Sequence, residues 1–145
     1  MDTLTAMQIS SSGLKAERAR LNIAAMNLAN ANTTRTMEGG PYRAKSVVFE
    51  AKPLDGVNFQ DTLNSTNERL RKVEVTKVVE DKAPFKEVYD PSHPDADTNG
   101  IVRFPNVNVA EQMVDMMGAK RAYEANVTAL DAAKNMALKA LDIGR

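Results

Sequence analysis

Apolar residues at heptad spacing occur at both ends of this 145-residue chain and are missing from its middle. The segment 106–145 contains one interior glycine and no proline. Its larger apolar side chains recur at steps of three, four and seven residues, which places them on one face of a helix: Met113, Met116, Tyr123, Val127, Leu130, Ala137 and Leu141. The segment is therefore predicted to form one long helix.

A second stripe of mostly small side chains lies beside the first on this predicted helix. Its members alternate by three and four residues: Ala119, Ala122, Asn126, Ala129, Ala133, Met136 and Ala140. Small side chains let another helix backbone approach closely. Two stripes on one helix indicate two partners.

The start of the chain carries a matching seam, and we expect a helix over residues 3–31. Met7, Leu14, Leu21 and Leu28 fall seven residues apart. The intervening core positions include Ser11, Arg18 and Ala25, which weaken the seam, so this helix would dimerise poorly alone. We therefore expect the two terminal helices to pair as a coiled coil.

The middle of the chain favours strands and turns. Short apolar or alternating runs at 45–51, 73–79, 85–89 and 101–104 predict strands. Residues 30–43 and 90–100 are rich in turn formers, and the polar segment 55–72 is interpreted as a mobile loop. The predicted fold is α+β, with a coiled-coil segment at 1–35, a small β-rich insert at 36–105 and a second coiled-coil helix at 106–145.

Composition excludes several classes of function. Nineteen basic and nineteen acidic side chains give no net charge, so neither nucleic acid nor an anionic membrane is an expected partner. No stretch approaches the roughly 20 apolar residues of a membrane span, and the first residues lack the pattern of a cleaved signal peptide. Cysteine is absent, which rules out disulfides, thiolate metal sites and a cysteine nucleophile.

One loop imitates a calcium site. Asp95, Asp97, Asn99 and Gly100 have the spacing that begins an EF-hand loop. The twelfth position is Asn106, which cannot supply the bidentate carboxylate, and prolines on both sides oppose the flanking helices. The single histidine, His93, cannot form a histidine metal cluster within one chain. We therefore predict a polar turn here, and no catalytic, cofactor-binding or metal site.

Two segments carry a family resemblance. The run NLANANTT, which begins at Asn27, resembles the N-terminal signature of the bacterial flagellar rod and hook proteins. The run EQMVDMMGAKRAYEANVTALDAAKNMALKALDIGR, together with DPSHPDADTNGIVRFPNVN before it, is similar to the C-terminal part of the same group. This resemblance implies a structural subunit of the basal-body proximal rod, exported by the flagellar type III apparatus and assembled with other rod proteins and further copies of itself in the rod across the periplasm.

The resemblance also implies where assembly contacts lie. The terminal helices would pack as an inner coiled-coil layer, through Leu14, Leu21, Asn27, Leu28, Asn30, Thr33, Met113, Tyr123, Asn126, Leu130 and Leu141. Two alternatives stay open from the residues alone. A soluble coiled-coil adaptor that binds a helical partner would share the seams but differ in location and assembly geometry. An enzyme or calcium sensor built on residues 90–100 would lose activity when Asp95 and Asp97 become asparagine.

Overall fold

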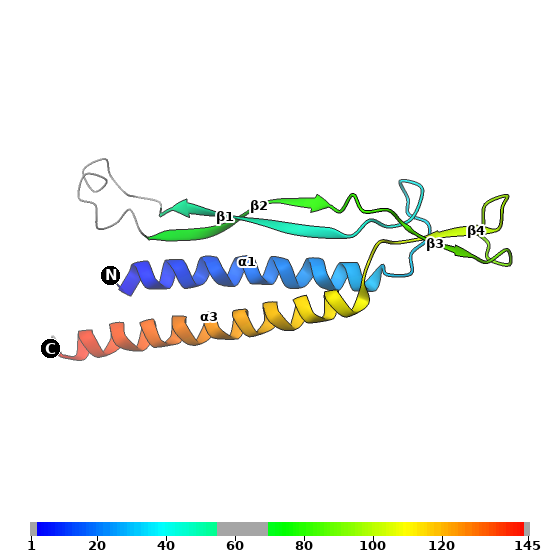
Figure 1. The fold of residues 1–145 in the computed structure, drawn as a ribbon. Helices are drawn as coiled ribbons and strands as arrows, with labels where there is room; N and C mark the ends of the chain where they lie inside the picture. The colour runs from blue at the N-terminus through cyan, green and yellow to red at the C-terminus, as the bar shows by residue number, and fades with distance from the viewer. Residues whose placement is uncertain (1–2, 55–69, 144–145) are drawn as a thin grey trace. The chain divides into compact units, whose positions relative to one another are not determined.

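The computed structural model describes residues 3–54 and 70–143, and within them it contains two long helices and four strands (Figure 1). The elements follow the order α1 (Thr3–Ala29), β1 (Lys45–Pro53), β2 (Arg71–Glu80), β3 (Lys86–Tyr89), β4 (Ile101–Phe104) and α3 (Val109–Ile143). The α+β prediction, with long terminal helices around a small β-rich insert, is confirmed.

The chain divides into two compact units, the first built from three segments and the second from two. Unit 1 comprises Met1–Ala19, Val48–Lys77 and Ala119–Arg145, and unit 2 comprises Arg20–Val47 and Val78–Gly118, so both long helices contribute to each. Within each unit the α1 and α3 segments run antiparallel (Figure 1). A terminal helix therefore finds its first partner inside its own chain.

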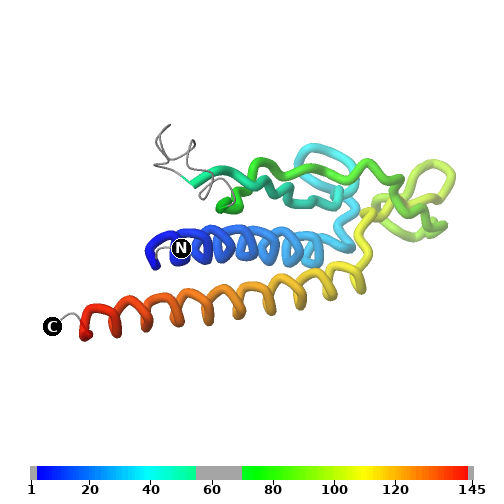
Figure 2. Tube along the Cα trace, turned by 60° about the vertical axis from the view of Figure 1, so that its left-hand side comes forward, coloured from blue at the N-terminus to red at the C-terminus, as the bar shows by residue number. Residues whose placement is uncertain are grey.

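Helix α1 passes through its serine-rich stretch without a break. The Ser12 hydroxyl donates to the Ile9 carbonyl at 2.7 Å and accepts from the Val73 amide of β2 at 3.1 Å, so the residue serves both helix and strand. The helix ends at Ala29, two residues before the predicted end, because the Asn30 side chain donates to the Met26 carbonyl at 2.9 Å and closes the last turn. Residues 30–44 then form the loop that leads to β1 (Figure 2).

Helix α3 starts at Val109, three residues later than predicted. The reason is Asn106, whose side-chain amide donates to the carbonyls of Asp81 and Ala83 at 3.3 Å and whose side-chain oxygen accepts from the Ala44 amide at 2.9 Å. These bonds hold Asn106 against the loop after β2 and outside the helix. The predicted end of this helix, residues 144–145, lies outside the described residues.

Strands β1 and β2 form one two-stranded antiparallel sheet (Figure 1). Ion pairs connect the two strands, with Lys52 Nζ 3.0 Å from Glu74 Oε2 in unit 1 and Lys45 Nζ 3.6 Å from Glu80 Oε1 in unit 2. β2 begins at Arg71, so the last two residues of the predicted mobile loop are strand. The rest of that prediction, residues 55–69, lies outside the described residues.

Strands β3 and β4 form the second sheet, an antiparallel hairpin that pairs Lys86 with Phe104 and Tyr89 with Ile101. Gly100 precedes β4 with a φ of +74°, a conformation that favours glycine. A Cβ at this position would lie 2.9 Å from Cε2 of Tyr89. Backbone conformation and close packing therefore both require glycine where the loop rejoins the hairpin.

Few apolar side chains are buried among the described residues, and most of them are small. They are Ala16, Ala24, Tyr42, Ala44, Val102, Ala119 and Ala133. The buried members on α1 and α3 are all alanines, which allow the helix backbones to approach closely but remove little apolar area from water. Residues 3–54 and 70–143 therefore supply little of the apolar core that normally stabilises long helices.

Candidate assembly interface

A buried asparagine connects three segments of unit 2. Asn27 of α1 is 1% exposed. Its side-chain oxygen accepts from the Tyr42 hydroxyl and the Lys45 amide, both at 2.9 Å, and its side-chain nitrogen donates to the Lys45 carbonyl at 2.7 Å and to Oε1 of Gln112 at 2.9 Å. Both donors and both acceptor positions of the amide are used. Asn27 thus fixes the end of α1 against the start of β1 and the first turn of α3.

The Tyr42 phenol and one ion pair also contribute to this junction. Burial, together with the nearby negative charge of Glu80, raises the pKa of Tyr42, so the phenol keeps the proton that it donates to Asn27. Arg20 Nη2 lies 2.9 Å from Asp115 Oδ1, although both side chains are about two-fifths exposed. An ion pair with that much exposure contributes little stability, about 0–1 kcal/mol. The hydrogen bonds of the Asn27 side-chain amide therefore contribute most of the stability of this junction.

In unit 1 the two helices meet at a glycine. A Cβ added to Gly13 of α1 would lie 2.9 Å from Nδ2 of Asn126 on α3. The Asn126 amide also donates to the Ala122 carbonyl at 3.0 Å, which holds its side chain along its own helix. The missing side chain at Gly13 therefore lets Asn126 sit against the backbone of α1.

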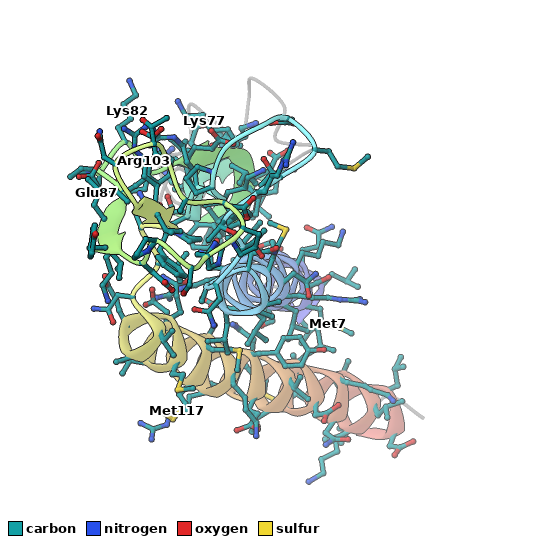
Figure 3. All side chains as sticks on the ribbon, turned by 90° about the vertical axis from the view of Figure 1, so that its right-hand side faces the viewer. Met7, Lys77, Lys82, Glu87, Arg103 and Met117 are labelled. Atoms are coloured by element: carbon teal, nitrogen blue, oxygen red, sulfur yellow. The ribbon has the colours of Figure 1, made fainter. Side chains whose placement is uncertain are left out.

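The large apolar side chains that remain exposed on α3 gather at its two ends. The head patch consists of Val109, Met113, Val114 and Met117, and the tail patch consists of Met136, Leu138, Leu141 and Ile143. Between the two patches, residues 118–135 contain no exposed large apolar side chain. Figure 3 shows the Met117 side chain on the side of α3 away from α1. Both patches are thus available to a neighbouring molecule.

The loop at residues 90–100, whose spacing resembles a calcium-binding loop, is held by hydrogen bonds to its aspartates. Oδ2 of Asp95 accepts from the Thr34 hydroxyl at 2.7 Å, and Oδ1 of Asp97 accepts from the Thr98 amide at 2.7 Å. Across residues 3–54 and 70–143, no three histidine or carboxylate side chains are placed to hold a metal ion. The arrangement is that of a capped polar turn.

The same loop offers a pH measurement. Hydrogen bonds from the Ser92 hydroxyl (2.6 Å) and the Ser92 amide (3.1 Å) lower the pKa of Asp90. A lowered folded-state pKa adds stability above the pKa of the unfolded chain, and this contribution is lost as the pH falls through the folded value. Ser92→Ala should therefore raise the Asp90 pKa toward its ordinary value, as followed by NMR titration of the carboxyl carbon. Ser46→Ala, at an exposed position of β1, is the control, and equal shifts in both variants would contradict the assignment.

Comparison with known proteins identifies the family of this chain. A family model described as flagella basal body rod protein matches residues 7–35, and a model described as the C-terminal part of flagellar basal body rod FlgEFG proteins matches residues 98–143. The flagellar basal-body rod protein FlgC of Salmonella typhimurium is 42% identical over 145 residues, with all of both chains covered. The chain belongs to the FlgC family of flagellar basal-body rod proteins.

Relatives from distant bacteria give the same result. FlgC of Bacillus subtilis is 41% identical with both chains fully covered, and FlgC of Borreliella burgdorferi is 40% identical over 99% of this chain and 98% of its own. The chain is accordingly a structural subunit of the flagellar rod, located in the basal body and assembled with other rod components. Within the described residues, neither long helix contains an apolar stretch able to span a membrane.

The eleven residues expected to make assembly contacts in this FlgC-family chain fall into three groups. Asn27, Asn30, Thr33 and Asn126 form hydrogen bonds within the chain. Leu14, Leu21, Leu28, Tyr123 and Leu130 are half-buried. Met113 and Leu141 are exposed, at 46% and 71%. Their role in contacts between subunits stays a prediction.

Several residues of the head and tail patches were not identified from the sequence. The head and tail patches also contain Val109, Val114, Met117, Leu138 and Ile143, which belong to neither predicted stripe of α3. Helical periodicity identifies most readily the stripe that contacts α1. It gives no reason to select the additional apolar residues at the two ends of α3. One sequence feature could have indicated the head patch: Gly118, the interior glycine of α3, lies beside Met117.

Proposed function

We propose that this rod subunit assembles through its terminal helices into the proximal part of the rod, as an inner layer that crosses the periplasm. The observation that carries the proposal is the exposure of large apolar side chains at both ends of α3, up to 87% at Ile143. An exposed side chain of this size gains about 1.5–3 kcal/mol when it is fully buried. The head and tail patches therefore favour contact with neighbouring subunits.

Export and partners follow from the same proposal. The chain reaches the rod through the flagellar type III apparatus and contacts other rod proteins and further copies of itself. The scarcity of large buried apolar side chains among the described residues supports this route, because a chain with a small core is unfolded with little free energy. The role is structural, with no catalysis, cofactor, nucleic acid or membrane insertion. The three-part division at residues 35 and 105 remains a prediction within this proposal.

Charged substitutions on the two helices test the assembly proposal. We expect Leu21→Asp and Leu130→Asp to abolish swimming and to remove the protein from isolated basal bodies, because both half-buried leucines lie on predicted apolar seams. Asn22→Asp and Ala132→Asp place the same charge on nearby exposed positions outside both predicted stripes and should retain motility.

A second readout separates assembly from folding. Immunoblots of whole cells should show each aspartate variant at the level of the unaltered chain, while the basal-body fraction contains only the two controls. Normal incorporation of Leu21→Asp and Leu130→Asp would contradict assembly through these seams. Loss of the protein from whole cells would instead assign both leucines to the fold of the subunit, and it would remove them from the interface.

A further inference from the structure

His93, the single histidine of the chain, accepts a hydrogen bond that only its neutral form can accept. We propose that protonation of this side chain releases the loop of residues 30–44 from the loop of residues 90–100. Both loops belong to unit 2, so the device lies within one compact unit. It is a pH-dependent latch, and it goes beyond the proposed assembly because it does not require a neighbouring subunit.

The latch consists of two successive hydrogen bonds through Asp95. The Asp95 amide donates to Nδ1 of His93 at 3.1 Å, and Oδ2 of Asp95 accepts from the Thr34 hydroxyl at 2.7 Å. The first bond closes the turn that presents the carboxylate, and the second ties this turn to the loop that follows α1. No other hydrogen bond joins residues 30–44 to residues 90–100, both of which the structure describes in full. Loss of the first bond therefore loosens the hydrogen-bonded link between the two loops.

The first bond fixes which form of the imidazole closes the latch. A neutral imidazole donates with one ring nitrogen and accepts with the other, whereas the protonated ring donates with both. Because Nδ1 of His93 accepts from the Asp95 amide, the closed latch requires the neutral ring with its proton on Nε2. A proton added to Nδ1 sets two N–H groups against each other and removes the bond. Histidine is the side chain that ordinarily takes up a proton at about pH 6.5, so a mildly acidic surrounding is enough.

Two carboxylates on the same loop stabilise the protonated ring. Asp90 is close enough to His93 that the charge of the imidazole adds to the two Ser92 hydrogen bonds in lowering the pKa of Asp90. The carboxylate of Asp95 belongs to the residue whose amide the ring binds. The neutral ring therefore has a hydrogen bond, and the protonated ring has an attraction to negative charge in its place. Each form is stabilised by a different contact, as a two-state latch requires.

The other elements around the ring contribute one uncharged contact and two cations. The ring of Phe104 on β4 packs edge-on against the imidazole, with 6.1 Å between ring centroids. Arg35 and Arg103 line a pocket together with Asp95, and Arg103 is also paired with Glu87 of β3 at 3.3 Å. The positive charge of the two arginines opposes protonation of the imidazole, and the carboxylates favour it.

Substitution by asparagine separates the hydrogen bond from the proton. An asparagine side-chain oxygen accepts from the amide two residues further along the chain, and this loop already contains such a turn between Asp90 and the Ser92 amide at 3.1 Å. His93→Asn should therefore keep the bond to the Asp95 amide at every pH. His93→Ala removes the acceptor at every pH. The two variants represent a latch that stays closed and a latch that stays open.

Hydrogen–deuterium exchange of the purified full chain tests the latch, with mass spectrometry of peptides from residues 30–44. At about pH 5.5 we expect this loop to exchange roughly fivefold faster in the unaltered chain than in His93→Asn, the effect of losing one hydrogen bond of ordinary strength. At about pH 7.5 the two proteins should exchange equally, and His93→Ala should exchange faster than both. Comparison at a common pH cancels the intrinsic dependence of exchange on pH.

A substitution at the other end of the latch supplies an independent test. Thr34→Val keeps the shape of the side chain but removes the hydroxyl that binds Asp95, so exchange in residues 30–44 should be fast at both pH values. Equal exchange of the unaltered chain and His93→Asn at about pH 5.5 would overturn the proposal. Slow exchange of His93→Ala at about pH 7.5 would also overturn it, because the histidine would then not hold the loops together.

Discussion

Replacing Asn27 with leucine is expected to lower the free energy of unfolding by about 3–5 kcal/mol, because the leucine fills the site but leaves several polar groups without partners. The Lys45 amide and carbonyl, the Tyr42 hydroxyl and the Gln112 side chain all bond to the Asn27 amide. A buried polar group left without a partner costs about 1–3 kcal/mol, so the losses accumulate. Urea unfolding followed by far-ultraviolet circular dichroism measures the change.

An exposed asparagine on the same helix supplies the control. Asn22→Leu makes the same chemical change in α1 at an exposed position, and should alter the free energy of unfolding by no more than about 0.5 kcal/mol. Equal effects of the two substitutions would show that the stability of α1 does not depend on its junction with β1 and α3. A large effect of Asn27→Leu alone would assign this residue to the fold of the subunit, before any contact with a neighbour.

Gly13→Leu is expected to destabilise the isolated chain by about 1–3 kcal/mol, since the new side chain must displace Asn126. Gly13→Ala should be nearly neutral. Its Cβ meets the mobile end of the Asn126 side chain, so a lost hydrogen bond of about 1 kcal/mol is offset by about 1 kcal/mol of improved helix propensity. Thermal unfolding of the purified variants measures both changes.

Gly118→Leu is the matched comparison for Gly13→Leu, because both replace an interior helix glycine. Its site is open, so the melting temperature should stay the same or rise. A fall in melting temperature as large as that of Gly13→Leu would mean that Gly118 is packed within the chain in solution. The pair of variants therefore separates a glycine required by the subunit from one available to a neighbour.

The regular elements were largely predictable because their signals are local. Heptad spacing identified both long helices, and alternation with turn formers identified all four strands. The errors lie at element boundaries, and two of them involve a partner in a distant segment. Asn106 was assigned to a helix, but its amide bonds to the backbone after β2. Arg71 was assigned to a loop, but it begins β2. Such partners are far away in the sequence, so no local pattern indicates them.

The candidate site was less predictable than the fold. Family resemblance correctly identified a rod subunit, and it selected Asn27 as an assembly contact because the residue belongs to a recognisable motif. In the structure that amide is 1% exposed and fully bonded inside the chain. A motif marks a residue as important without saying whether it serves the subunit or the assembly. The distinction requires burial and hydrogen-bond partners, which depend on how α1, β1 and α3 come together.

The bonding at Asn27 has a consequence for the surroundings in which the subunit can keep its shape. Its partners are a backbone amide and carbonyl, a phenol and a side-chain amide, so these hydrogen bonds involve no charged group. Dissolved ions screen exposed ion pairs such as that of Arg20 and Asp115, but they have little effect on buried neutral hydrogen bonds. A rise in salt concentration around the basal body should therefore weaken the surface charge pairs first and leave this joint between helix and strand intact.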